Sequence, residues 1–444
     1  MRDPLAYVRA VHFAATIMVA GGVFFMVAVA EPAFRLGASG TQVAAQVAAT
    51  VRRRVARMVW IALALAVLSS AAWLVLIAAA MSGEPAAGVF TGGVLWTVLS
   101  QTDFGNDWLV RFVIACLLAG RFVAFFTAQR GQSLALKTVT ALLAAALVGS
   151  LAWSGHGVGG LGSEAVFHLL ADVLHLVAAA AWVGALVPLA LLLQAAGADP
   201  DALAVARAAT ARFSALGMAS VATLLVTGVV NSWYLVGGVA ALTGTVYGRL
   251  LIAKVVVFLG MVAIAAVNRL YLTPALMRAD AAGAARALRH LRRNAAIEAF
   301  AGAAVIVIVA KLGTLPPAIH AAHQHPAYTS AVPADAAFQH IHSEQGMADV
   351  TIEPGRVGAA HATIRLWTED FEALEARQVT FTLTPPGAGG KPVTRLAVQD
   401  TEGAWQVEGL VLAQPGAWTV EVDAVLEADR RLVLDAPIAI EPKN

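Results

Sequence analysis

Histidine supplies most of the metal-binding chemistry that this sequence can offer. The chain has eleven His residues and a single Cys, Cys116, which lies in an apolar run. One Cys cannot form an intrachain disulfide or a CxxC metal site, so a metal site would depend on His, Met, Asp or Glu. The positions of the His residues are therefore the first guide to function.

One group of ionisable residues lies inside an apolar run and consists of His168, Asp172 and His175. Their i, i+4, i+7 spacing places them on one face of a helix. Ionisable residues within a membrane usually face the bundle interior or water. Two imidazoles and a carboxylate can coordinate a metal ion, or the carboxylate can orient a ligating imidazole. The alternative is a polar network that holds helices together.

Two other His residues are candidate ligands on the same side of the membrane. His12 lies in the first apolar run, at about the depth of Asp172 for a helical rise of ~1.5 Å per residue, and Met18 and Met26 follow it. Imidazole and thioether ligands suit copper, although Met also commonly fills gaps between packed side chains. His156, in a loop, could be a relay ligand at the entrance or an ordinary loop residue.

A denser group follows the last apolar run. His320, His323 and His325 form an HxxHxH array, and His340 and His342 form HxH. Short His-rich tracts are typical of metal binding, but copper and zinc both accept imidazole, so the spacing does not choose the metal. The alternative is a solvated linker in which these residues are incidental. We expect an accessory site that collects copper outside the membrane.

The composition predicts a membrane protein. Hydrophobic residues make up 59% of the chain and charged residues 13%, against roughly 45–50% and 25% in soluble domains. Eight apolar runs are long enough to cross a hydrocarbon layer of ~30 Å, and they should be helices because open sheets cannot span lipid. These runs lie at about 8–30, 58–81, 108–128, 134–154, 165–194, 210–236, 249–272 and 294–315.

The basic residues predict how these helices are oriented. The loops after the first, third, fifth and seventh runs carry Arg or Lys, whereas loops 82–107, 155–164 and 237–248 carry none. By the positive-inside rule, the basic loops face the cytoplasm of a bacterium and both termini are periplasmic. Residues 28–30 resemble a signal-peptidase site, but cleavage there would place the cluster 52–54 outside, so we retain the first helix. The net charge of +2 does not favour nucleic acid as a partner.

The sequence divides into three parts. Residues 1–315 are predicted to be an all-α domain with about eight transmembrane helices, 316–346 a His-rich extracytoplasmic linker, and 347–444 a periplasmic all-β domain. In the last part, polar and apolar residues alternate in segments such as 363–367 and 378–383, which predicts strands. About seven short strands suggest an immunoglobulin-like β-sandwich.

Several segments resemble the CopD/PcoD family of copper-resistance membrane proteins. In chain order they are Arg212-Phe213-Ser214, Thr227-Gly228, Trp233, Thr245-Val246-Tyr247-Gly248-Arg249-Leu250-Leu251, Lys254, Asn268-Arg269, Arg292-Arg293 and Glu298. His12, Asp172-Val173-Leu174-His175 and Ala181-Trp182-Val183-Gly184 are also similar to the family. The resemblance covers about 1–317 and implies an eight-helix inner-membrane protein for copper uptake or for transfer from a periplasmic carrier. Residues 347–441 are similar to YtkA-like β-sandwich domains.

The favoured interpretation is a copper-transporting protein of the lipid bilayer, with copper gathered by the His-rich linker or delivered by a periplasmic chaperone of CopC type. The copper ion would pass through a site formed by His12, His168, Asp172 and His175. The sequence shows no nucleotide-binding motif and does not predict an enzyme. One alternative is b-type haem electron transfer, with His12 as one axial ligand and either His168 or His175 as the other. Another is a membrane factor that delivers copper to an oxidase.

Polar residues near the predicted cytoplasmic side are expected to be structural. Arg269 and Glu298 both approach that side, and we expect that they could pair with each other.

Overall fold

The structure is a computed structural model. It describes residues 4–37, 42–82, 85–90, 93–127, 133–154, 163–197, 199–236, 238–278, 280–315, 333, 335–343, 346–368, 373–386, 391–401, 403–426 and 430–442. The chain divides into two compact units, 1–322 and 323–444, which we describe separately.

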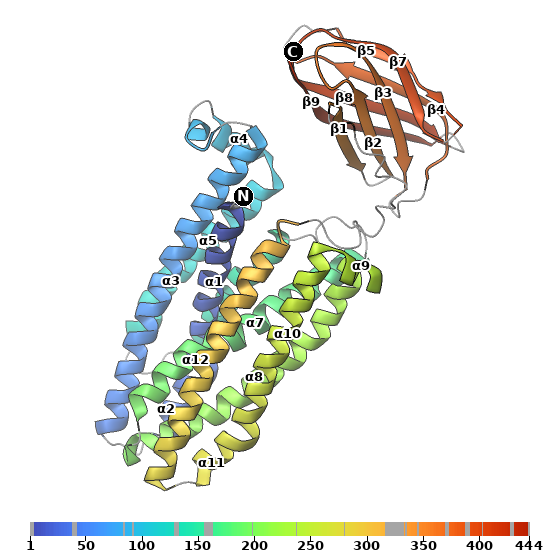
Figure 1. Ribbon diagram of the computed structural model, residues 1–444. Coiled ribbons are helices and arrows are strands. Elements are labelled where there is room, and N and C mark those ends of the chain that lie inside the picture. The colour runs from blue at the N-terminus through green and yellow to red at the C-terminus, as the bar shows by residue number, and fades with distance from the viewer. Residues whose placement is uncertain are drawn as a thin grey trace. The chain divides into compact units, whose positions relative to one another are not determined.

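The first unit is a bundle of long helices joined by short ones (Figure 1). The long helices are α1 (Pro4–Phe24), α3 (Gln42–Ser82), α5 (Asp103–Thr127), α6 (Leu134–Gly149), α7 (Ser163–Ala196), α8 (Pro200–Val236), α10 (Val246–Val267) and α12 (Ala281–Leu312). The short ones are α2 (Glu31–Gly37), α4 (Val94–Gln101), α9 (Val239–Gly244) and α11 (Thr273–Arg278), with single turns of π or 3-10 helix at 25–30, 88–90, 150–154 and 268–272.

Membrane-spanning character follows from length and composition. In the described part of the chain, seven segments are long and apolar enough to cross a membrane: Pro4–Arg35, Gln42–Ser82, Leu134–Trp153, Val166–Ala196, Ala202–Val236, Val246–Arg278 and Ala282–Leu312. The remaining predicted run, 108–128, falls on α5, a helix of 25 residues. Large apolar side chains such as Val229, Trp233 and Phe300 are exposed on the outside of the bundle, as contact with lipid requires. The predicted polytopic helical fold is confirmed.

Short polar side chains fix where three of these helices begin. Ser133 accepts a hydrogen bond from the backbone N–H of Leu136 at α6, and Asp280 accepts one from Gly283 at α12. Thr245 does the same for Gly248 at α10. Each contact satisfies one of the N–H groups that a helix leaves unpaired at its first turn.

The helix α7 occupies the centre of the bundle, where it packs against α1, α3, α6, α8 and α12. Its contact with α1 is close because both helices carry glycine there. A Cβ at Gly21 would lie 2.3 Å from the backbone of Gly184, and a Cβ at Gly184 would lie 2.3 Å from the carbonyl oxygen of Ile17. No side chain fits in that space. The polar face of α7 is thus carried on a helix that packs against five other long helices.

The second unit is a sandwich of two antiparallel sheets, which confirms the predicted all-β domain. One sheet has the order β1-β2-β3-β7-β6 and the other β5-β4-β8-β9. Alternate residues of β3 and β8 are buried, as expected for strands that cover a core with one face. The strands are β1 (Ala337–Ser343), β2 (Gly346–Glu353), β3 (Gly358–Trp367), β4 (Ala376–Thr384), β5 (Val393–Leu396), β6 (Val398–Gln399), β7 (Trp405–Leu412), β8 (Gly416–Leu426) and β9 (Arg431–Ile440).

The sandwich begins earlier than the sequence predicts. Its edge strand β1 starts at Ala337 and pairs with β2 along its whole length. His340 and His342 therefore lie in a strand, and the prediction that they belong to the linker is wrong. The HxH spacing that we interpreted as a metal-binding tract is also the alternation of an edge strand.

Candidate functional site

The polar face of α7 meets a matching polar face on α8. The ring of His168 stacks on Tyr234, with 4.7 Å between centroids. Asp172 accepts a hydrogen bond of 2.5 Å from the side-chain amide of Asn231. His175 lies 2.9 Å from the hydroxyl of Thr227, measured from its Nδ1. We call these six residues, His168, Asp172, His175, Thr227, Asn231 and Tyr234, the polar seam.

The seam follows from the antiparallel packing of the two helices. Thr227, Asn231 and Tyr234 are spaced i, i+4, i+7 in α8, which is the spacing of His168, Asp172 and His175 in α7. Residues with this spacing share a helix face, so two such faces can meet position by position in reverse order. The α8 partners were missed from the sequence, yet the repeated spacing is a signal that could have found them.

The Thr227 hydroxyl fixes the tautomer of His175. That hydroxyl donates its one hydrogen to the carbonyl oxygen of Thr223 at 2.7 Å. Because the hydrogen is used, the contact with His175 requires Nδ1–H to be the donor and the Thr227 oxygen to be the acceptor. The lone pair of the neutral ring is then on Nε2, the atom that can bind a metal ion. The ring packs beside Gly228, where an added Cβ would lie 3.7 Å from Cε1.

The charges around Asp172 come from two helices. On α7, His168 approaches it, with 3.9 Å between Nε2 and Oδ2. On α10, Lys254 is within electrostatic range of both Asp172 and His175. The carboxylate of the seam thus lies within electrostatic range of an amine on α10, outside the seam itself.

His12 is buried against α3. Its Nδ1 lies 3.0 Å from the carbonyl oxygen of Ala66 and 3.1 Å from the hydroxyl of Ser69, both on α3. The ring meets Trp73 edge-on, with 5.6 Å between centroids. Its Nε2 is buried and has no hydrogen-bond partner among the residues that the structure describes. These contacts connect His12 to α3, whereas the hydrogen bonds of the seam connect α7 to α8.

Two arginines surround the same tryptophan. The guanidinium of Arg9 lies 5.0 Å from the ring centre of Trp73, and that of Arg111 lies 5.8 Å away. Arg9 also donates to the carbonyl oxygen of Gly313 at the end of α12, and Arg111 to that of Ser150. Two fixed positive charges next to His12 disfavour a copper cation there. No motif in the sequence predicts this cluster.

The polar residues at the other end of the bundle form a separate network. Asn268 donates to Glu298 at 2.8 Å and accepts from Asn294 at 2.7 Å. Arg269 instead donates to the hydroxyl of Ser214 at 2.8 Å. The expected pairing of Arg269 with Glu298 is therefore wrong. An amide satisfies the buried Glu298, and Arg269 connects α8 to the segment after α10.

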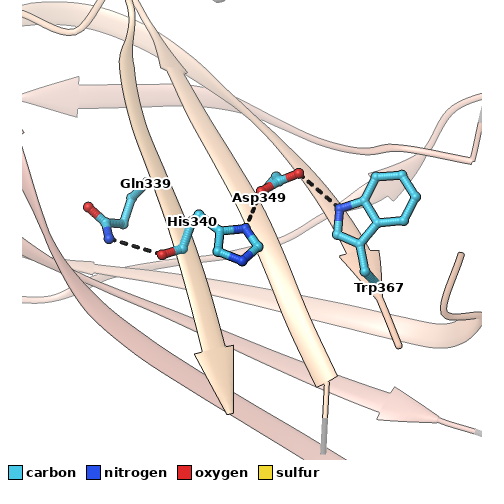
Figure 2. Close-up of polar contacts among 4 residues, drawn as sticks. All are labelled: Gln339, His340, Asp349 and Trp367. Atoms are coloured by element: carbon cyan, nitrogen blue, oxygen red, sulfur yellow. Dashed lines mark hydrogen bonds and ion pairs between the residues drawn. The ribbon is translucent and has the colours of Figure 1, made fainter. Parts of the chain in front are cut away.

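On the β-sandwich, His340 is held by a carboxylate (Figure 2). Its Nδ1 lies 2.6 Å from Oδ1 of Asp349, its partner on β2. The indole N–H of Trp367 donates to the other oxygen of Asp349 at 2.9 Å. A carboxylate can only accept, so the neutral ring of His340 carries its proton on Nδ1 and its lone pair on Nε2. The ring is exposed to solvent.

The other predicted ligands are outside the described residues. These are His156, His320, His323 and His325, together with the side chain of His342, whose backbone pairs with Met347. Within the residues that are described, no group of three or more His, Cys, Asp and Glu side chains is close enough to hold a metal ion. The seam itself contributes a carboxylate and two imidazoles along one helix face.

These observations define a class: a polytopic helical membrane protein with a polar seam inside its bundle and an all-β domain at its C-terminal end. Comparison with known families adds to this. Residues 207–312 match the family model described as Copper resistance protein D, and residues 1–166 match Copper resistance protein D-like, N-terminal domain. Thr227, Asn231, Tyr234 and Lys254 lie in the first of these ranges.

Three curated relatives are similar to this chain. Copper resistance protein D of Pseudomonas syringae pv. tomato is 35% identical over 227 residues, which cover 50% of this chain and 72% of that protein. Copper transport protein CutJ of Bacillus subtilis (strain 168) is 25% identical over 337 residues, 75% of this chain and 58% of CutJ. Inner membrane protein YebZ of Escherichia coli (strain K12) is 33% identical over 223 residues, with 50% and 72% covered. The chain belongs to the copper resistance protein D family.

Proposed function

We propose that this protein moves copper across the cytoplasmic membrane of a bacterium, and that the copper passes along the polar seam between α7 and α8. The proposal rests on the hydrogen bond between His175 and Thr227. Because Thr227 accepts from Nδ1–H, the Nε2 atom of His175 presents a lone pair. Relatives named copper resistance protein D and copper transport protein support copper as the cargo. The role proposed is that of a carrier and not of an enzyme.

Asp172 supplies the negative charge that a copper cation needs inside a membrane. An isolated cation is expensive in hydrocarbon, and a carboxylate nearby offsets part of that free energy. Without copper, Lys254 interacts electrostatically with Asp172. Binding of copper by His175 would place a second positive charge near the same carboxylate, so copper and Lys254 compete for it. This competition allows the seam to release the ion again.

The β-sandwich supplies an accessory collecting site, at His340. Its imidazole is exposed and its tautomer is fixed by Asp349, the arrangement that orients many metal-binding His residues. Together with the His residues of 320–325, it would raise the local concentration of copper outside the membrane. A periplasmic chaperone of CopC type is the proposed source of that copper. Both termini are proposed to be periplasmic.

Copper binding by the purified full-length protein tests this proposal. We expect His175→Ala to remove one bound copper and Asp172→Asn to weaken its affinity roughly 10–100-fold. The control is His290→Ala, which removes an imidazole from the arginine-rich end of α12. Full copper binding by a well-folded His175→Ala variant would contradict the site. A Soret band in the absorption spectrum that disappears with His175→Ala would instead support haem-based electron transfer.

A further inference from the structure

A groove of about 660 Å³ lies between α7 and α12, at the end of the bundle that carries the arginine-rich segment. Its α7 wall is aliphatic except for Gln194, and its α12 wall carries three guanidinium groups. The lining residues are Leu186, Val187, Ala190, Leu191 and Gln194 of α7, and Arg289, Arg292, Arg293, Ala295, Ala296 and Ala299 of α12. The groove therefore combines an apolar surface with a concentrated positive charge.

The packing of the two helices explains where the groove begins. At Gly302 the helices are in close contact, since an added Cβ would lie 2.4 Å from Cγ1 of Val183. Beyond this contact, toward the arginines, the facing residues of α12 are small: Ala299, Ala296 and Ala295. Short side chains leave space between helix axes that are already fixed by the contact at Gly302. The groove is that space.

The arginines form one continuous basic wall. Arg289, Arg292 and Arg293 are spaced i, i+3, i+4 and share a face of α12. Arg289 and Arg293 are exposed and Arg292 is half-buried. Among the described residues, none of the three forms a hydrogen bond or ion pair with another side chain. A fourth guanidinium, that of Arg54 on α3, donates to Gln194 at 3.2 Å at the edge of the groove.

We propose that this groove binds an anionic phospholipid. Its phosphate would contact Arg289, Arg292 and Arg293, because guanidinium groups bind phosphate oxygens in pairs. One acyl chain would lie against the aliphatic wall formed by Leu186, Val187, Ala190 and Leu191. Basic pockets between transmembrane helices on the cytoplasmic side are where such headgroups bind. A soluble phosphate would use the arginines but leave the apolar wall exposed to water, which favours a lipid.

The lipid would bridge α7 and α12 at the end opposite the polar seam. Its binding depends only on groove residues and not on copper, so this inference stands or fails independently of the proposed transport. The expected consequence is that anionic lipid stabilises the bundle whether or not copper is present.

Native mass spectrometry of the full-length protein, with phosphatidylglycerol and phosphatidylcholine in competition, tests the inference. We expect the wild-type protein to retain phosphatidylglycerol in preference to phosphatidylcholine. In the triple variant Arg289→Gln, Arg292→Gln, Arg293→Gln, this preference should fall at least about tenfold. The charge-matched control removes Arg53, Arg278 and Arg286, three exposed arginines outside the groove, and should keep it. Equal loss in both triple variants would overturn the groove as the site.

Two further arms cover the remaining outcomes. Ala190→Trp fills the groove without changing any charge, and we expect it to displace phosphatidylglycerol as the arginine variant does; retention of the lipid would overturn the proposed position. Inorganic phosphate should raise the thermal midpoint much less than phosphatidylglycerol at the same concentration. Equal stabilisation by free phosphate would show that the groove recognises an anion and not a lipid.

Discussion

The polar seam and the β-sandwich both hold a histidine by its Nδ1, but they use different partners. Inside the bundle the partner of His175 is the neutral hydroxyl of Thr227, whereas on the sheet the partner of His340 is the carboxylate of Asp349. A carboxylate in solvent is inexpensive because water still reaches it, while each added charge inside a membrane is costly. Location, and not the need to orient an imidazole, therefore decides the partner.

Exchanging the partner in the bundle should have the largest effect. Thr227→Asp adds a second carboxylate beside Asp172 within the membrane, and we expect it to destabilise the folded protein by up to about 3 kcal/mol. The measurement is the thermal midpoint of the purified protein in lipid nanodiscs. Thr243→Asp, on the exposed helix α9 outside the spanning segments, is the control and should leave the midpoint nearly unchanged. A similar fall in the thermal midpoint of both variants would mean that the position of Thr227 inside the bundle does not make the added carboxylate more costly.

Removing the partner in the bundle should affect copper and not folding. Thr227→Val keeps the shape of the side chain but loses the acceptor for Nδ1–H of His175, so the ring is no longer held in one tautomer. We expect copper affinity to fall roughly 10–100-fold, measured by competition with a chelator of known affinity. Thr227→Ser restores the hydroxyl and should recover most of the affinity. If the Thr227→Val variant binds copper as tightly as the wild-type protein does, the Thr227 hydroxyl does not orient His175.

The corresponding change on the sheet should be milder. Asp349→Asn should cost little stability, because the exposed contact with His340 contributes only about 0–1 kcal/mol and the Asn carbonyl can still accept from Trp367. We expect Cu(II) retention at His340 to weaken by about tenfold, detected by electron paramagnetic resonance of the full-length protein. His361→Gln, on the neighbouring strand β3 opposite Glu353, is the matched control. Uptake should decline only at low external copper, since His340 belongs to the accessory site.

A second carboxylate of the sandwich shows how little a surface charge pair contributes. Arg431 donates to Oδ1 of Asp423 at 2.7 Å and holds the pKa of that carboxyl below its ordinary value. A depressed pKa stabilises the fold above the ordinary Asp range of about 3.9, and this stabilisation is lost as pH falls through the folded-state value. Hydrogen exchange in β8 and β9 should therefore be slightly faster in Arg431→Gln at neutral pH. The two proteins should converge once the pH has fallen below the folded-state pKa of Asp423; a difference that persists there would mean that packing, not charge, is involved.

The sequence predicted the helices and the all-β domain well because long apolar runs and strict alternation are local signals. The α7 face was also visible, since His168, Asp172 and His175 are periodic within one helix. Which helix each residue faces is a property of tertiary packing. The sequence placed His12 opposite the α7 residues by depth alone, whereas its hydrogen bonds are to α3. The cluster of Arg9 and Arg111 around Trp73 could not be predicted, because each is a single arginine in an otherwise apolar segment.

Copper uptake into sealed membrane vesicles tests whether copper crosses the membrane along the polar seam. The variants are His175→Ala and His340→Gln, compared with wild type at matched protein levels and over a range of copper concentrations. We expect His175→Ala to abolish copper uptake at every concentration and His340→Gln to reduce it only when copper is scarce. Wild-type uptake by the His175→Ala vesicles would contradict passage of copper along the seam. A complete loss of uptake in the His340→Gln vesicles alone would contradict an accessory role for His340.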